Sequence, residues 1–212
     1  MADSDLPRGS IRFPRLRLVP PTGGYRSGRP CPATAAPANE PRREMVTAGG
    51  HRLVLRAAGP ADLPAARAMH ARCSPQTLAQ RYHGPAGEAD HYLAHLLNPR
   101  HGQSVVAETA DGQVVALGHL LWDDEESEVA LLVEDAWQRL GVGSALLRSL
   151  LAVAARARRE VVYAVLPGSG AGMAAVMRGS GLAVEHRAEE GALVLTARLS
   201  PLPAILPAPA GG

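Results

Sequence analysis

The sequence predicts an α/β domain, because strand-like and helix-like segments alternate along the middle of the chain. Two further observations support this class. An Asp-Gly pair joins two strand-like segments, and a third such segment leads through a glycine-containing loop into a long leucine-rich helix. Residues 1–44 are rich in Pro, Gly and Arg, and residues 201–212 are rich in Pro and Ala. Such segments bury little apolar surface, so we expect both to be disordered and the domain to cover residues 45–200.

The composition argues against several classes of partner. The formal net charge is +2 and charged residues are 20% of the chain, so no large field of one sign would attract nucleic acid or an anionic membrane. No apolar run approaches the roughly 18 residues that a membrane-spanning helix needs. Cys31 and Cys73 lie far apart without metal-ligand spacing. We therefore expect neither a disulfide nor a metal site, and a cytoplasmic location fits.

The first half of the domain is expected to contain one strand and three helices. Leu53 and Leu55 alternate with other residues at period two, which predicts a strand at residues 51–57. Ser74 can cap a helix, and Pro75 suits its first position because an N–H there would have no helical partner. The helices are expected at residues 61–72, from Pro75 to Arg81, and at residues 88–97.

The second half begins with a predicted hairpin. The Asp111-Gly112 pair readily supplies the positive φ angles of a two-residue turn, which predicts strands at residues 104–109 and 113–122. The acidic run from Asp123 to Glu126 is expected to form a solvated turn before a third strand at residues 128–133. The remaining elements are expected to be helices at residues 141–158 and 171–179 and strands at residues 161–166, 182–187 and 192–199.

The loop between the third strand and the long helix has the properties of an anion site. The first N–H groups of a helix have no intrahelical acceptor and lie at the positive end of its dipole, so they can bind phosphate oxygens. Gly141 and Gly143 carry no side chains that would hold a diphosphate away from these groups. Arg139 adds a positive charge nearby.

This loop resembles a known signature. Gln138-Arg139-Leu140-Gly141-Val142-Gly143 matches the Gln/Arg-x-x-Gly-x-Gly/Ala pattern of GNAT acetyltransferases, where it binds the pyrophosphate of coenzyme A. The resemblance implies a GNAT fold with a mixed, mainly antiparallel sheet flanked by helices, and acetyl-CoA as co-substrate. It also implies that the strand holds the pantetheine arm. The coenzyme-binding residues are then Leu131, Leu132, Val133, Gln138, Arg139, Leu140, Gly141, Val142, Gly143 and Ser144.

The resemblance also implies a reaction, in which a primary amine attacks the thioester directly. Attack requires a neutral amine and hence a base, and Glu128 is our choice because related enzymes carry a Glu at the start of this strand. Glu125 and Glu126 compete with it. Tyr163 is a weaker candidate for the general acid, and His119 is expected to be a packed histidine.

The acceptor is less well defined. The segment from Ser74 to Tyr82 is similar to one in the branch related to bacterial protein lysine acetyltransferases, so a protein lysine leads and a small amine follows. The protein is expected to be a monomer or a homodimer. A non-catalytic acyl-CoA sensor stays open, because no Asn precedes Met173 as it often does in the family. A dinucleotide site is a further alternative, with glycines at residues 168–175 and an acidic Glu185 downstream.

Overall fold

The computed structural model describes residues 42–82, 89–123, 126–167, 170–189 and 192–199. The two expected disordered ends lie outside these residues, apart from residues 42–44. The strands are β1 (Arg43–Val46), β2 (Arg52–Ala58), β3 (Gly102–Thr109), β4 (Val114–Asp123), β5 (Glu126–Val133), β6 (Val161–Pro167), β7 (Val184–Glu189) and β8 (Ala192–Arg198). The helices are η1 (Pro60–Asp62), α1 (Leu63–Arg72), α2 (Pro75–Tyr82), α3 (Ala89–Leu96), η3 (Asp135–Trp137), α4 (Val142–Arg156) and α5 (Ala171–Arg178).

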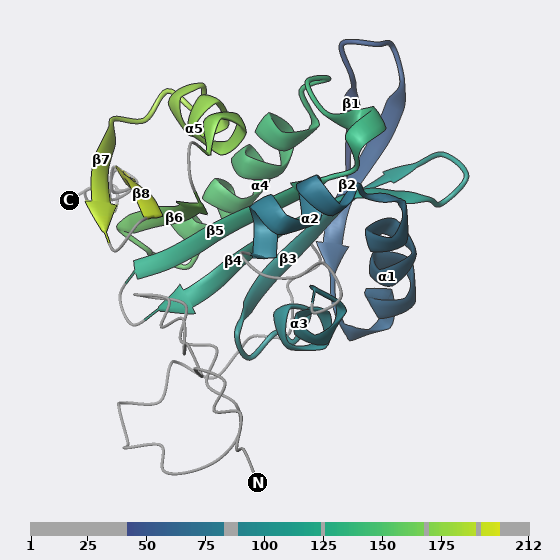
Figure 1. Cartoon of the computed structure of the whole chain (residues 1–212), viewed down its shortest axis with the longest axis horizontal. Coiled ribbons are helices and arrows are strands. Elements are labelled where there is room, and N and C mark those ends of the chain that lie inside the picture. The colour runs from purple at the N-terminus through teal and green to yellow at the C-terminus, as the bar shows by residue number, and fades with distance from the viewer. Residues whose placement is uncertain (1–41, 83–88, 124–125, 168–169, 190–191, 200–212) are drawn as a thin grey trace, which may run out of the picture. The chain divides into compact units, whose positions relative to one another are not determined.

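The strands form one sheet in the order β1-β2-β3-β4-β5-β6-β8-β7, and the predicted mixed, mainly antiparallel arrangement is confirmed (Figure 1). Among the described strands, β5 and β6 are the one pair that runs in parallel. That pairing is short, running from Glu126 opposite Val161 to Glu128 opposite Tyr163. Beyond this point both strands continue without pairing to each other, so the sheet opens in its middle.

Helices cover both faces of the sheet. Leu146, Leu147 and Leu150 of α4 pack with α5 against one face, as the leucine spacing predicts. Helices α1, α2 and α3 cover the other face, where Met69, Leu78 and Leu93 pack on β3, β4 and β5. Alternation along β5 places Glu128 and Leu132 on this second face and Val129 on the first. None of the described helices is long and apolar enough to cross a membrane.

Three local predictions need correction. The sequence does not predict strand β1, which begins at Arg43. The hairpin turn is not a two-residue turn: Gly112 has φ +86°, Asp111 does not have a positive φ, and Gly112 N–H bonds to Thr109 O at 3.0 Å. A longer loop closed by a left-handed glycine explains this geometry. Glu126 lies in β5, opposite Asp123, rather than in the turn.

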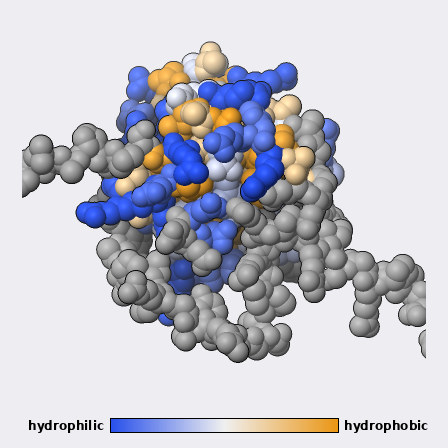
Figure 2. Space-filling model, turned by 90° about the vertical axis from the view of Figure 1, so that its left-hand side faces the viewer, coloured by the Kyte–Doolittle hydropathy of each residue, from blue (hydrophilic) through white to orange (hydrophobic). Residues whose placement is uncertain are grey.

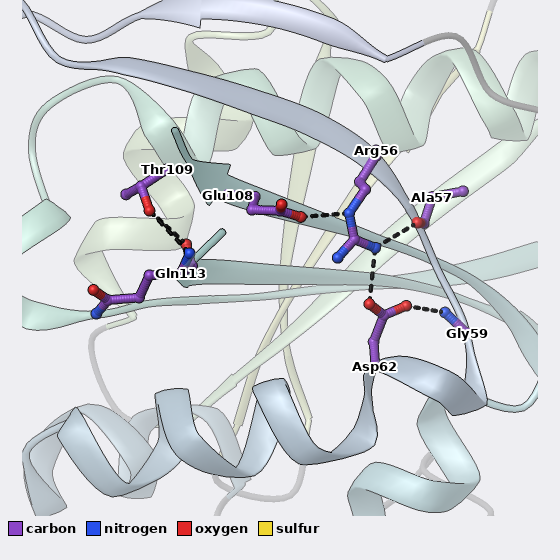
Figure 3. Close-up of polar contacts among 7 residues, drawn as sticks. All are labelled: Arg56, Ala57, Gly59, Asp62, Glu108, Thr109 and Gln113. Carbon is purple, nitrogen blue, oxygen red and sulfur yellow. Dashed lines mark hydrogen bonds and ion pairs between the residues drawn. The ribbon is translucent and has the colours of Figure 1, made fainter. Parts of the chain in front are cut away.

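Ion pairs join the first strands to the start of α1 (Figure 3). Arg56 of β2 bonds through Nε to Glu108 of β3 at 2.5 Å and through Nη1 to Asp62 at 2.8 Å. Asp62 also accepts from the Gly59 N–H at 2.9 Å. Burial alone would lower the pKa of Arg56, but the two carboxylates outweigh it and the pKa is raised. This network holds the start of α1 at the end of β2.

The far edge of the sheet is polar. Strand β7 pairs only with β8, and its residues Glu185, His186 and Arg187 are exposed. Figure 2 views this side of the molecule and shows hydrophilic residues mixed with hydrophobic ones. Charged side chains on an edge strand discourage pairing with another sheet.

Candidate functional site

The loop that enters α4 leaves amide groups free of helical partners. Gly141 is the N-cap, with φ +88°, and no side chain caps the helix. The first bond into the helix runs from the Ala145 N–H to the Gly141 carbonyl at 3.1 Å. The N–H groups of Val142, Gly143 and Ser144 precede that bond, so they lie at the positive end of the helix dipole without a helical acceptor. The loop therefore has the anion-binding property that its sequence predicts.

The loop is held firmly at its base. Leu140 accepts a hydrogen bond from the Ala48 N–H at 3.1 Å, and its side chain packs against the core. The ring of Trp137 meets the ring of His51 edge to face, with centroids 5.3 Å apart. Arg139 is exposed and has φ +59°, a conformation that non-glycine residues seldom adopt. Such local strain is typical of loops whose shape serves a ligand.

The side chain of Gln138 has a positioning role in the structure. Its Nε2 donates to the Val133 carbonyl at 3.1 Å and to Thr77 Oγ1 at 3.1 Å. Gln138 thus ties the end of β5 to α2. Because Gln138 Nε2 makes both of these bonds, any contact of Gln138 with coenzyme A would involve its other polar atoms.

The opening between β5 and β6 exposes backbone groups of β5. The Glu134 N–H bonds to Val115 O at 3.0 Å, toward β4, so by strand alternation the backbone groups of Leu131 and Val133 point the other way. They face the side from which β6 has diverged. Leu132 differs, since by the same alternation its backbone groups point toward β4. Of the three predicted strand residues, Leu131 and Val133 are the ones placed to offer backbone bonds to an extended ligand.

Helix α2 is fastened over this part of the sheet by Asp135, which follows β5. The Asp135 carboxylate accepts from the Ser74 N–H at 2.8 Å, from Ser74 Oγ at 2.7 Å and from Thr77 Oγ1 at 2.8 Å. These bonds lower the pKa of Asp135. Ser74 Oγ accepts from the Thr77 N–H at 3.2 Å, which confirms Ser74 as the helix cap. The far end of α2, which carries Arg81, is thereby held over β5.

A buried polar cluster lies under this end of α2. Glu128 is 5% exposed and stands at the last β5–β6 pair, where the sheet opens. Burial raises its pKa to about 7, against the opposing attraction of Arg81, and Asp123 adds a smaller push upward. A carboxyl group with a pKa near neutrality can accept a proton at physiological pH, which suits it as a general base. Of its predicted competitors, Glu126 lies two residues earlier on the same face, and Glu125 lies outside the described residues.

His119 is neutral, and its tautomer follows from its neighbours. Ser104 Oγ donates to Leu96 O at 3.0 Å, so it must accept from His119 Nδ1 at 2.8 Å. The proton is then on Nδ1, and Nε2 is a buried acceptor without a partner among the described residues. Full burial holds the pKa of His119 well below its ordinary value, and the charge of Arg81 lowers it further. The predicted hydrogen-bonded, packed histidine is what the structure shows.

Tyr163 lies opposite Glu128 on β6 and is buried. Its hydroxyl donates to Asp123 Oδ2 at 2.7 Å, so the proton that a general acid would supply is already engaged. This contact favours the packed aromatic over the acid catalyst.

A sheet that opens beside a glycine-bearing helix start agrees with the GNAT class that the loop sequence resembles. The family model described as "Acetyltransferase (GNAT) family" matches residues 61–175, which is more than half of the chain. The chain therefore belongs to the GNAT acetyltransferase family and is an acyltransferase. Members of this family transfer an acetyl group from acetyl-CoA, their co-substrate.

Solved structures agree on the fold. The GNAT domain of S. lividans PAT superposes with a TM-score of 0.63 at 21% identity, covering 74% of this chain and 97% of that one. The ribosomal-protein-S18-alanine N-acetyltransferase of Escherichia coli gives 0.55 at 18% identity, covering 73% and 98%. A cAMP-binding acyltransferase from Mycobacterium smegmatis gives 0.53 at 19% identity, covering 79% of this chain and 50% of that one. No curated protein sequence matches the chain.

The dinucleotide alternative finds no support in the topology. Strand β8 lies between β6 and β7, so the two strands that flank α5 are not neighbours as a dinucleotide-binding unit requires. Glu185 is exposed on the edge strand. Gly168 and Ser169 lie outside the described residues.

Sequence reasoning missed one residue of the polar cluster, Arg81. The sequence places it at the end of a short helix and within the Ser74–Tyr82 segment but predicts no role for it, although its charge acts on both Glu128 and His119. The Ser74 cap could have pointed to Arg81, because a helix whose start is fixed at Pro75 has Arg81 in its last turn.

Proposed function

We propose that this protein moves the acetyl group of acetyl-CoA to a primary amine, with Glu128 as the general base. The single observation that carries the proposal is the position of Glu128, a buried carboxyl with a pKa of about 7 at the point where β5 and β6 part. An extended thioester lying along the open edge of β5 would bring its carbonyl past this residue. The coenzyme and the base would thus meet at one place in the sheet.

The coenzyme is proposed to lie along β5 and end at α4. Backbone groups of Leu131 and Val133 would bind the pantetheine arm. The amides of Val142, Gly143 and Ser144 would bind the diphosphate, with Arg139 close by in the same loop. The Val133 carbonyl already accepts from Gln138, so its N–H is the group that stays open to the ligand.

The reaction needs one proton acceptor and one leaving group. The neutral amine nitrogen attacks the thioester carbonyl carbon, a C–N bond forms, the C–S bond breaks, and coenzyme A leaves as a thiolate. The nitrogen gives up its proton to Glu128, and the thiolate takes up a proton. General base catalysis of this kind commonly contributes roughly 100- to 10,000-fold to the rate.

A protein lysine is the first acceptor class to test, on the resemblance of the Ser74–Tyr82 segment, and small amines are the second. The structural neighbour from E. coli is named for the N-acetylation of an alanine, so an α-amine is also within the reach of this fold. A cytoplasmic location and a monomeric or homodimeric state stay predictions.

The test is release of free thiol from acetyl-CoA with a panel of amines and lysine-containing proteins. We expect turnover by the wild type, a loss of at least about 100-fold in Glu128→Gln, and no loss in Glu185→Gln, which removes an exposed carboxylate at the far edge of the sheet. Full activity of Glu128→Gln would refute the assignment of the base. Binding of acetyl-CoA without turnover of any amine would favour the non-catalytic sensor instead.

A further inference from the structure

The guanidinium of Arg81 presents a pair of buried donors that bind nothing in the described structure. Both Nε and Nη2 are buried, and neither has a hydrogen-bond partner among the described residues. These two N–H groups lie on the same edge of the planar group and point in one direction, which is the geometry that receives both oxygens of a carboxylate. An arginine in a protein cannot lose its charge to relieve this situation. A buried donor pair without a partner is costly, and a planar anion would satisfy both at once.

The guanidinium of Arg81 is in contact with an aromatic ring. Its Cζ lies over the Tyr82 ring, 4.7 Å from the ring centroid, which is a cation–π contact. The Tyr82 hydroxyl contacts His70 Nε2 at 3.0 Å, and His70 Nδ1 contacts Asp90 Oδ1 at 2.9 Å. The ring that supports Arg81 is therefore itself held in place. A guanidinium that neighbouring side chains already support loses less conformational entropy on binding a ligand than a mobile one.

The charge around Arg81 also selects its ligand. The field of Arg81 lowers the pKa values of Glu128 and His119, so it reaches the proposed catalytic base. Arg81 is a cation whose Nε and Nη2 are buried without a partner among the described residues, and its charge disfavours acceptors that bring further cations, such as polyamines. An amine that brings its own carboxylate would balance it.

We propose that Arg81 binds a carboxylate of the acceptor, and that the acceptor is therefore an amine that also carries a carboxylate, as an amino acid does. This inference rests on the proposed function, because it places the reacting amine at Glu128 and the carboxylate at Arg81. Arg81 is then the residue that determines acceptor specificity. The other possible source of a carboxylate is the acyl chain of the donor, and the experiment separates the two.

The experiment compares matched substrates with acetyl-CoA as donor. Each of the common L-amino acids is tested beside its carboxamide, and kcat/KM is measured from thiol release. The carboxamide has a less basic amine, so the quantity compared is the acid-to-amide ratio of the wild type divided by that of a variant. We expect Arg81→Gln to lower this ratio by roughly 10- to 100-fold, because bonds to a charged group are lost only for the acid. Arg81→Lys keeps the charge without the fork and should fall between the two.

A matched control is Arg67→Gln, which removes an exposed arginine from α1 and should keep the wild-type ratio. An unchanged ratio in Arg81→Gln would overturn the inference. An Arg81-dependent preference for succinyl-CoA over acetyl-CoA would place the carboxylate on the donor and overturn the acceptor assignment. Absence of thiol release with every amine would defeat the proposed function itself, which is a distinguishable result.

Discussion

The replacement Glu128→Gln is expected to stabilise the fold at alkaline pH while abolishing activity. The pKa of Glu128 is about 7 in the fold, against an ordinary value of 4.5. The raised pKa means that the folded state prefers the protonated form. The associated stability is therefore fully present below pH 4.5 and is lost as the pH rises through 7. Since one pKa unit corresponds to about 1.36 kcal/mol, ionisation of this one group removes about 3 kcal/mol of unfolding free energy by pH 8.

Gln keeps the volume and polarity of the side chain without the charge, so the variant should avoid this loss. We expect the unfolding free energy of Glu128→Gln minus that of the wild type to be small at pH 4.5 and to rise to about 3 kcal/mol at pH 8. For a domain of this size that corresponds to a rise in Tm of roughly 6 to 10 °C at pH 8.

The assay is urea unfolding of both proteins at several pH values, followed by circular dichroism. Taking the difference between the two proteins removes the contributions of the other titrating groups. Glu185→Gln, an exposed carboxylate, serves as the control and should show no such dependence. A difference that stays flat between pH 4.5 and 8 would show that Glu128 is not desolvated as the structure has it.

Three further predictions follow from the site. The pH profile of kcat/KM, corrected for ionisation of the acceptor amine, should inflect near pH 7 and fall on the acid side, because the base must be unprotonated. A profile that stays flat down to pH 5 would exclude Glu128 as the general base. Gly143→Ala should leave Tm nearly unchanged, because the added Cβ would meet Val176 at an ordinary 3.5 Å, but it should weaken acetyl-CoA binding measured by calorimetry. Gly141→Ala, at φ +88°, should instead cost about 1 kcal/mol of stability. Equal acetyl-CoA affinity in Gly143→Ala and the wild type would count against the loop as the diphosphate site. Asp135→Ala removes three hydrogen bonds that hold α2, so it should lower the unfolding free energy by about 1 kcal/mol and reduce turnover more than coenzyme affinity. Glu44→Ala, which changes an exposed residue of β1, is the control. Unaltered turnover in Asp135→Ala would mean that α2 does not position the polar cluster.

The parts of the fold that the sequence predicts well are those fixed by local chemistry. The Ser74-Pro75 pair sets the start of α2, because cap and first-turn preferences act within four residues. The leucine spacing sets the buried face of α4. Strand β1 was missed for the opposite reason: Arg43 and Glu44 are exposed and lack apolar alternation, and only pairing with β2 makes the segment a strand. The predicted hairpin turn is wrong because Asp-Gly fits more than one loop length, and here the Thr109 N–H bonds to Gln113 O at 2.9 Å across the longer loop.

The candidate site likewise has one part that the local sequence predicts and one part that it does not. The anion-binding loop depends on glycines at set positions before a helix, so Gly141 and Gly143 identify it from sequence. The cluster of Arg81, His119 and Glu128 depends on tertiary packing, because α2 and two neighbouring strands bring these residues together from distant positions. Burial, and hence the pKa of Glu128, has no local signature. The orientation of the Arg81 guanidinium has no local signature in the sequence either.

Hydrogen exchange with two ligands tests most directly whether the amides at the start of α4 bind a diphosphate. Exchange is followed by mass spectrometry on a peptide covering residues 139–145 with no ligand, with pantetheine and with coenzyme A. Pantetheine lacks the diphosphate, so we expect it to slow exchange along β5 only. Coenzyme A should slow exchange at Val142, Gly143 and Ser144 as well. Equal exchange of these three amides in all samples, under conditions where coenzyme A is bound, would contradict the account.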